Sequence, residues 1–316
     1  MIENLLVCIG AQKAGTSWLD SVLRKDVRLN FCPFIKEIHY FDYIYNNSPH
    51  LNNWRANRFI KLVSKEGMEL HRPLSEALSH EDRLYALPSR KTEKYSRLLT
   101  DIQLLSGPIN DLWYTRLLTG HSQTSWSVDI TPDYAVIGTN GFAHLKRIAK
   151  NLKIIFILRD PVERSWSGLL QGQKHKPGGL EEFFKTELKN IDRLLKICTV
   201  GEDVGKRSDY ATTIYHLKEA DLFHQCSIQY YDDLAARPGQ FLKNLYDFIG
   251  LDFPNANEDL KQAIRARVHQ TNGAILIPKP LESGLIDYYQ EKLRGLASLV
   301  PVPRAWLSRR IHNAPI

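Results

Sequence analysis

A lysine, two glycines and two hydroxyl side chains fall within one short segment near the start of the chain, Gly10-Ala11-Gln12-Lys13-Ala14-Gly15-Thr16-Ser17. Loop N–H groups at a helix N-terminus attract anions, and lysine and hydroxyl groups add further donors. The glycines have P-loop spacing, but Lys13 lies inside the loop, whereas an ATP site needs its lysine after the second glycine. We therefore expect phosphate to be bound in another way, by Gly10, Gln12, Lys13, Ala14, Gly15, Thr16, Ser17 and Trp18.

A second group of ionisable side chains, Lys36, Glu37 and His39, follows a strand pattern at residues 27–31. In parallel sheets the carboxyl ends of strands face the ligand crevice. A glutamate has an ordinary pKa of about 4.3, so Glu37 is ionised at neutral pH and could accept a proton. His39, with an ordinary pKa of about 6.5, is the alternative base. The other interpretation is a solvated Lys-Glu pair at a helix start.

Arg159 directly follows the clearest buried strand pattern, residues 153–158, and Ser167 lies in the helix pattern that comes next. The planar fork of an arginine can bond two oxygens of a phosphate at once. The alternative for Arg159 is a charge at a strand end that pairs with Asp160. Taken with the first loop, these residues predict two anion sites, as a ligand with two separate phosphate groups would need.

Strands and helices alternate along the chain in the order that positions these residues. Strand patterns lie at residues 5–9, 27–31, 125–130, 153–158 and 227–231. Helix patterns lie at residues 16–25, 54–63, 110–118, 142–149, from 162 onward, 180–195, 210–223, 240–249, 259–268 and 282–296. This alternation predicts an α/β fold, a P-loop-like three-layer sandwich with a central parallel sheet flanked by helices.

We expect residues 1–316 to form one domain, with residues 43–125 as a helical insertion that shapes an acceptor site. The basic tail at residues 301–316 is expected to pack on that domain or fray; contact with a membrane surface or a partner is the alternative.

The chain has 316 residues, 43% of them hydrophobic, with a net charge of +7. That charge suits an anionic ligand, although a merely soluble basic protein would also show it. The start lacks a signal-peptide pattern, and no run reaches the roughly 20 apolar residues of a membrane span. The four cysteines form no C-x-x-C pair and the histidines have no metal-ligand spacing. We expect free thiols, a cytoplasmic location, no metal and no nucleic-acid partner.

Five segments in order resemble the sulfotransferases that use 3′-phosphoadenosine 5′-phosphosulfate (PAPS), most closely the branch of heparan sulfate N- and 3-O-sulfotransferases and their bacterial relatives. Residues 9–17 are similar to the family's 5′-phosphosulfate loop, and residues 157–167 to its 3′-phosphate motif. Residues 36–41 resemble the segment with the catalytic glutamate, and residues 131–134 the Thr/Ser-Pro-x-Tyr element. Residues 231–251 resemble the segment YEDL…P…FLGL.

The resemblance implies transfer of a sulfuryl group from PAPS to a hydroxyl or amine, without a metal, and with adenosine 3′,5′-bisphosphate as the second product. It implies that Glu37 is the base, that Lys13 stabilises the leaving group and that His39 orients the acceptor or Glu37. Arg159 and Ser167 would bind the 3′-phosphate. Position alone adds candidates for the cofactor, Arg207 and Tyr210, and for the acceptor, Lys36, His39 and Tyr134.

Two features depart from the glycosaminoglycan enzymes: Ile130 stands where they often have a lysine, and no cysteine follows Cys226 to close their C-terminal loop. The acceptor could be a saccharide, a lipid, a small metabolite or a tyrosyl peptide, and the oligomeric state is not predicted. Two other functions stay open. One is a P-loop kinase that uses ATP and magnesium; against it, the strand at 153–158 ends in Arg159, not in an aspartate. The other is a non-catalytic nucleotide- or polyanion-binding protein.

Overall fold

Five parallel strands form the central sheet. The computed structural model describes residues 1–33, 35–64, 100–119, 126–174, 176–201, 203–254, 258–266 and 275–309. In this part of the chain the strand order is β2-β3-β1-β4-β5. The strands are β1 Ile2–Gly10, β2 Leu29–Phe31, β3 Trp126–Ile130, β4 Ala149–Leu158 and β5 Cys226–Tyr230. Every neighbouring pair is parallel, which confirms the predicted α/β fold.

The central position of β1 explains its composition. Leu5, Leu6 and Val7 are fully buried, as expected for a strand with a neighbour on each side and helices over both faces. Cys8 pairs with Ile130 of β3 and with Ile155 of β4, so the strands end close to one another. The segments after these strands therefore meet at one edge of the sheet.

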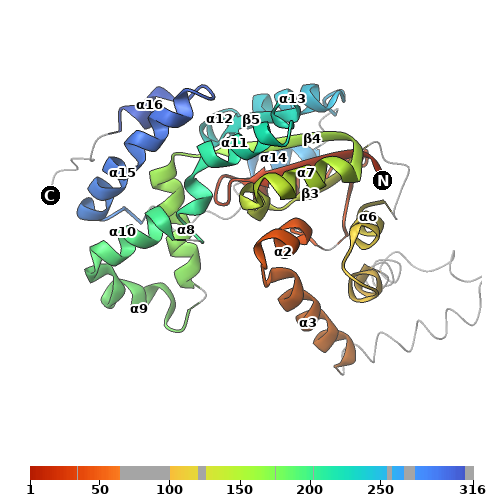
Figure 1. The fold of residues 1–316 in the computed structure, drawn as a ribbon, viewed down its shortest axis with the longest axis horizontal. Helices are drawn as coiled ribbons and strands as arrows, with labels where there is room; N and C mark the ends of the chain where they lie inside the picture. Colours follow the sequence, from red (N-terminus) through yellow and green to blue (C-terminus); the bar gives the residue numbers. More distant parts are fainter. Residues whose placement is uncertain are drawn as a thin grey trace, which may run out of the picture.

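Helices flank the sheet in two groups (Figure 1). One group is α1 Thr16–Leu23, α13 Pro238–Ile249 and α14 Glu258–Arg265, in which α14 contacts both other helices. In the other group α7 Gly138–Ile148 contacts α2 Tyr40–Asn46 and α11 Tyr210–Glu219. Further α-helices among the described residues are α3 His50–Val63, α6 Asp111–Thr119, α8 Pro161–Lys174, α9 Gly179–Lys185, α10 Ile191–Val200, α12 Tyr231–Ala236, α15 Lys279–Ala297 and α16 Arg304–Leu307.

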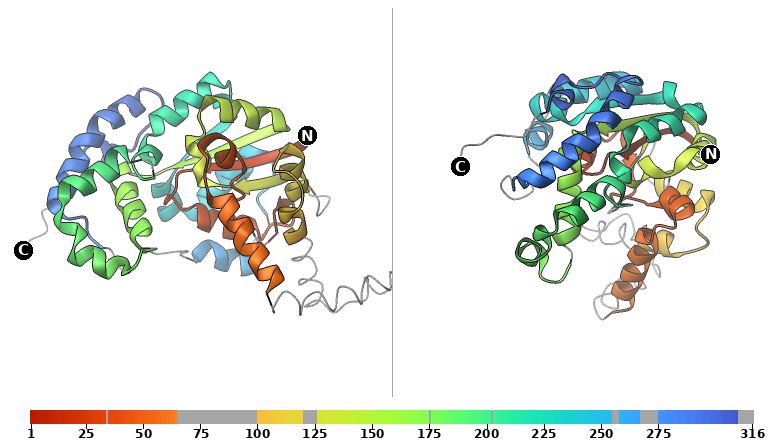
Figure 2. Two further views of the ribbon diagram at one scale, coloured as in Figure 1. Left: turned by 60° about the horizontal axis from the view of Figure 1, so that its bottom comes forward. Right: turned by 60° about the vertical axis from the view of Figure 1, so that its left-hand side comes forward.

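A second apolar cluster lies to one side of the sheet, among the green and blue helices α8, α9, α10 and α15 (Figure 2). Its buried members include Trp166, Phe183, Leu194 and Leu285, each from a different helix. Packing against these helices fixes the orientation of α8, which also borders the first loop of the chain.

The structure corrects three predicted elements. The helix predicted at 180–195 is two helices, because the side chain of Asn190 accepts a hydrogen bond from Arg193 N and caps α10. The strand predicted at 27–31 begins only at Leu29, because Asp26 and Arg28 pair across the preceding turn. A helix start in this segment was only the alternative interpretation, but the structure has the helix α2, which begins after His39; His39 has a left-handed conformation, and its side chain forms no capping hydrogen bond.

Several predictions fall partly outside the described residues. Of the insertion at 43–125, residues 65–99 and 120–125 lie outside them, so its role at an acceptor site stays a prediction, as does the single domain. The described part of the tail packs on the rest of the chain through Trp306 and Arg309, as predicted. All four cysteines are free thiols. No helix among the described residues combines the length and apolar character needed to cross a bilayer.

Candidate functional site

The carboxyl ends of four strands bring the predicted site segments together. The loop from Ala11 to Gly15 follows β1, and the segment with Glu37 follows β2. Thr131 follows β3 and Arg159 follows β4. Ligands of open α/β sheets bind at this edge. The segments that the sequence singled out thus share one end of the sheet.

The first loop has the backbone conformation of an anion-binding turn. Lys13 and Gly15 both have left-handed φ angles, 70° and 89°. A Cβ atom on Gly15 would lie 2.9 Å from Leu234 Cδ1, so a side chain there would be both strained and crowded. Within the described residues, no hydrogen bond takes up the N–H groups of Lys13, Gly15 or Thr16. These donors remain free for a ligand at the start of α1.

The side chain of Lys13 extends from the loop to α8, where its Nζ lies 3.4 Å from Oε1 of Gln171. Burial lowers the pKa of Lys13, and the cations Arg159, Lys174 and Arg164 lower it further. This concentration of positive charge favours an anion beside Lys13.

One face of α8 lines the loop. Arg164 contacts Gln12 and Gln171 contacts Lys13, and these two helix residues are separated by two helical turns. Ser167 lies between them on the same face. Its hydroxyl is buried and has no hydrogen-bond partner in the described part of the chain. A buried polar atom without a hydrogen-bond partner lowers the stability of the fold. The Ser167 hydroxyl is therefore suited to form a hydrogen bond with a bound ligand.

Arg164 is a component of the site that sequence reasoning missed. It is fully buried, and its guanidinium donates to the backbone and side-chain oxygens of Gln12, to Val204 O and to Ser208 Oγ. All of these acceptors are neutral, and burial lowers the pKa of Arg164 to about 10. The sequence offered one signal for Arg164: it precedes Ser167 by one helical turn. A buried positive charge behind the loop adds to the attraction for an anion.

Arg159 lies against the first loop, where Nη1 donates to Lys13 O over 2.9 Å. Its guanidinium also lies 4.7 Å from the ring centroid of Tyr231. The alternative interpretation, a pairing of Arg159 with Asp160, does not occur, because Asp160 binds Arg309 instead. The hydroxyl of Tyr210, a predicted cofactor contact, is buried and donates to Arg159 O. Tyr210 therefore supports Arg159 through its backbone.

Glu37 lies between two cationic side chains. It pairs with Lys36, and its Oε2 lies 3.4 Å from Nε2 of His39. Burial alone would raise the pKa of Glu37, but the hydrogen bond from His39 and the charge of Lys36 outweigh it and lower this pKa to about 2. The carboxylate is therefore ionised at neutral pH, as a base must be.

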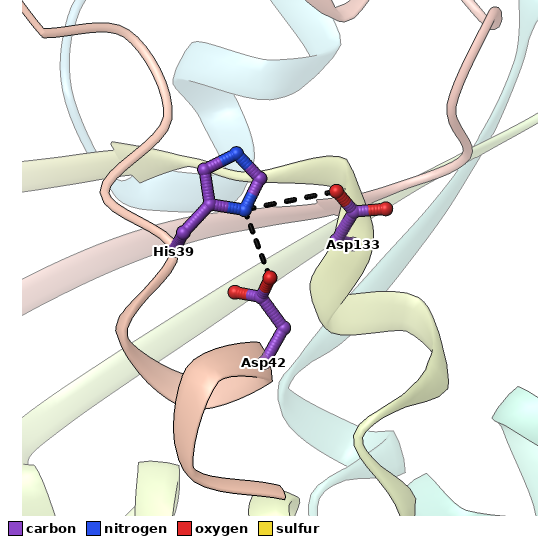
Figure 3. A group of neighbouring side chains, drawn as sticks. All are labelled: His39, Asp42 and Asp133. Carbon is purple, nitrogen blue, oxygen red and sulfur yellow. Dashed lines mark hydrogen bonds and ion pairs between the residues drawn. The ribbon is translucent and has the colours of Figure 1, made fainter. Parts of the chain in front are cut away.

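His39 belongs to a buried network with two aspartates (Figure 3). Nδ1 lies 2.9 Å from Asp42 Oδ2 and 3.7 Å from Asp133 Oδ2. Burial would lower the pKa of His39, but Asp42, Glu37 and Asp133 raise it to about 10. His39 is therefore protonated at neutral pH, which favours Glu37 over His39 as the base. Arg207, a predicted cofactor contact, is bound to Asp133, with Nε 2.7 Å from Oδ1.

The ligand atoms of His39, Asp42 and Asp133 lie within 4.8 Å of one another, so this group could geometrically hold a metal ion. A metal would have to displace the proton of His39 and compete with Arg207 for Asp133. We regard the group as an ion-pair network, and the absence of a metal stays a prediction.

The Thr-Pro-x-Tyr element holds the segment that carries Glu37. Thr131 Oγ1 accepts a hydrogen bond from Ile38 N, and the Tyr134 hydroxyl accepts one from Tyr40 N. Tyr134 was predicted to contact the acceptor. Its side chain is instead fully buried and its hydroxyl donates to Asp129, so it positions the segment that carries Glu37. Trp18 is similarly turned into the core, where Nε1 donates to Ile264 O.

Comparison with known proteins agrees with this geometry. A family model described as "Sulfotransferase family" matches residues 6–255. No curated protein shows significant sequence similarity to the chain. The structure of a sulfotransferase from Alicyclobacillus acidocaldarius matches 97% of this chain and 99% of that chain, with 15% identity and a TM-score of 0.58. The sulfotransferase domain of the Synechococcus PCC 7002 olefin synthase covers 96% of each chain, with 17% identity and a TM-score of 0.50.

Proposed function

Because this chain belongs to the sulfotransferase family, we propose that it transfers the sulfuryl group of PAPS to a hydroxyl or amine of an acceptor. One observation carries this proposal. The free N–H groups of the first loop, the ammonium group of Lys13 and the unpartnered hydroxyl of Ser167 lie around the same contact between the loop and α8. Such a set of donors fits a ligand with several anionic oxygens.

In the proposed binding mode, the loop N–H groups and the hydroxyls of Thr16 and Ser17 bind the 5′-phosphate. Arg159 and Ser167 bind the 3′-phosphate. Arg164 holds the loop in place through Gln12.

The proposed reaction is an in-line displacement at sulfur. The bond between sulfur and the bridging oxygen of the 5′-phosphate breaks while a bond from the acceptor oxygen or nitrogen to sulfur forms. Lys13 neutralises the charge that develops on the bridging oxygen, and Glu37 accepts the acceptor's proton. Protonated His39 and Lys36 orient the Glu37 carboxylate. Adenosine 3′,5′-bisphosphate leaves.

The acceptor is proposed only by class: a saccharide, a lipid, a small metabolite or a tyrosyl peptide. A glycosaminoglycan acceptor would follow from the resemblance to the heparan sulfate branch. The departures at Ile130 and in the cysteines weigh against it.

Arg159→Ala should weaken the binding of adenosine 3′,5′-bisphosphate by about 100-fold, because an arginine–phosphate pair at a partly buried site is a strong charge-assisted interaction. It should change the affinity for adenosine 5′-monophosphate, which lacks the 3′-phosphate, by less than about threefold, since that nucleotide makes no such pair. Isothermal calorimetry on both ligands measures the difference.

The matched control for Arg159→Ala is Arg237→Ala, which removes an exposed arginine that pairs with Asp233 on α12. This variant should bind both nucleotides like the wild type. Equal losses of affinity for the two nucleotides in Arg159→Ala would contradict the assignment of Arg159 to the 3′-phosphate.

A further inference from the structure

Arg309, near the end of the described chain, binds three carboxylates at once. Nη1 lies 2.6 Å from Asp160 Oδ2, and Nη2 lies 2.8 Å from Glu163 Oε1 and 2.9 Å from Glu282 Oε1. Asp160 and Glu163 stand at the start of α8, and Glu282 is on α15. Only about 14% of the Arg309 side chain is exposed. The tail is thus tied to the helix that borders the candidate site.

Glu163 lies between two arginines. Its Oε1 is bound to Arg309, while its Oε2 lies 3.6 Å from Nη2 of Arg159. Arg159 is the residue assigned above to the donor's 3′-phosphate, so Glu163 and that phosphate compete for one guanidinium. Arg309 holds Oε1 of Glu163 and also binds Oδ2 of Asp160, whose other oxygen accepts a hydrogen bond from Val162 N.

We propose that Arg309 is a positioning residue for the donor site, which keeps Arg159 available to the 3′-phosphate by binding the competing carboxylate of Glu163. This inference rests on the proposed function. Without Arg309, the Glu163 carboxylate beside Arg159 would lose its closer cationic partner, and Asp160, the next residue in the chain, would lose its arginine as well. Glu163 would then pair with Arg159 through both oxygens, and the added negative charge would repel a dianionic phosphate.

A purely structural role for Arg309 is the competing explanation, because the same contacts join the start of α8 to α15. The two roles depend on different carboxylate partners of Arg309. The structural role depends on Glu282, which is buried and bonds Arg309 from the other helix. The electrostatic role depends on Glu163, the carboxylate that touches both arginines.

The test uses Arg309→Met alone and combined with Glu163→Gln or with Glu282→Gln, in the full chain. Affinities for adenosine 3′,5′-bisphosphate and adenosine 5′-monophosphate are measured by calorimetry, with thermal unfolding recorded for each variant. We expect Arg309→Met to weaken bisphosphate binding about tenfold and to leave monophosphate binding within about twofold. Adding Glu163→Gln should restore bisphosphate affinity, and adding Glu282→Gln should not.

Equal weakening of both nucleotides by Arg309→Met, or equal rescue by the two glutamine substitutions, would overturn the inference. If Arg309→Met does not fold, Glu163→Gln alone decides: removing the competitor should tighten bisphosphate binding about threefold, and an unchanged affinity would overturn the inference. A wild-type protein that binds the bisphosphate no better than the monophosphate would instead contradict the proposed function.

Discussion

Replacing Lys13 with methionine should lower kcat by about 10²–10³-fold, the usual cost of removing one group that stabilises transition-state charge. Methionine keeps most of the apolar part of the lysine side chain. The left-handed backbone at this position, where φ is 70°, therefore carries a side chain of similar shape in both proteins. The affinity for adenosine 3′,5′-bisphosphate should fall by less than about tenfold, because the loop N–H groups and Arg159 remain. Label transfer from PAPS to any acceptor that the wild type sulfates measures kcat.

The control for Lys13→Met is Lys174→Met. Lys174 is exposed at the end of α8 and contributes to the positive field that lowers the pKa of Lys13, but it does not contact the loop in the described residues. Its removal should change kcat by less than about threefold, as expected for a screened surface charge. If both lysine variants lost activity equally, the general field would explain the effect, and the specific role of Lys13 in the leaving group's departure would be refuted.

Glu37→Gln should reduce kcat by about 10²–10⁴-fold, the range associated with loss of a general base. Glutamine has the same shape but cannot take the acceptor's proton. Binding of adenosine 3′,5′-bisphosphate should stay within about threefold of the wild type, since Glu37 is not assigned to the nucleotide. Single-turnover transfer and calorimetry on the same variant separate the two effects.

The pH dependence distinguishes Glu37 from His39 as the base. The pKa of Glu37 is lowered to about 2 and that of His39 is raised to about 10. With Glu37 as the base, both groups keep their active charge between about pH 5 and 8, so kcat/KM should be nearly flat there. With His39 as the base, the deprotonated fraction would grow and kcat/KM would rise steadily toward pH 10. Retained activity in Glu37→Gln with loss in His39→Ala would also reverse the assignment.

Much of the fold was predictable because its signals are local. The short runs of branched apolar residues in β1 and β4 predicted buried strands, and their alternation with helix patterns predicted parallel pairing. Helix ends were less accurate. The break at Asn190 depends on one side-chain cap, and periodicity alone does not detect such a cap within a helical pattern.

The candidate site was predictable where its residues stand directly at strand ends. The loop with Lys13, the segment with Glu37 and Arg159 all meet at the sheet edge, as parallel topology requires. Partners set by tertiary packing were not predictable. Arg309 lies 149 residues from its partner Asp160. Tyr134 was predicted to contact the acceptor because the sequence does not reveal its burial or its hydrogen bond to Asp129.

The most direct test of the donor assignment is a calorimetric titration of the wild-type protein with adenosine 3′,5′-bisphosphate, beside a titration with ATP and magnesium. We predict micromolar or tighter binding of the bisphosphate, unaffected by a metal chelator, and binding of ATP with magnesium at least about 100-fold weaker, because Lys13 stands inside the loop and not after Gly15. Binding of ATP with magnesium but not of the bisphosphate would contradict the PAPS-dependent mechanism and favour a phosphotransferase.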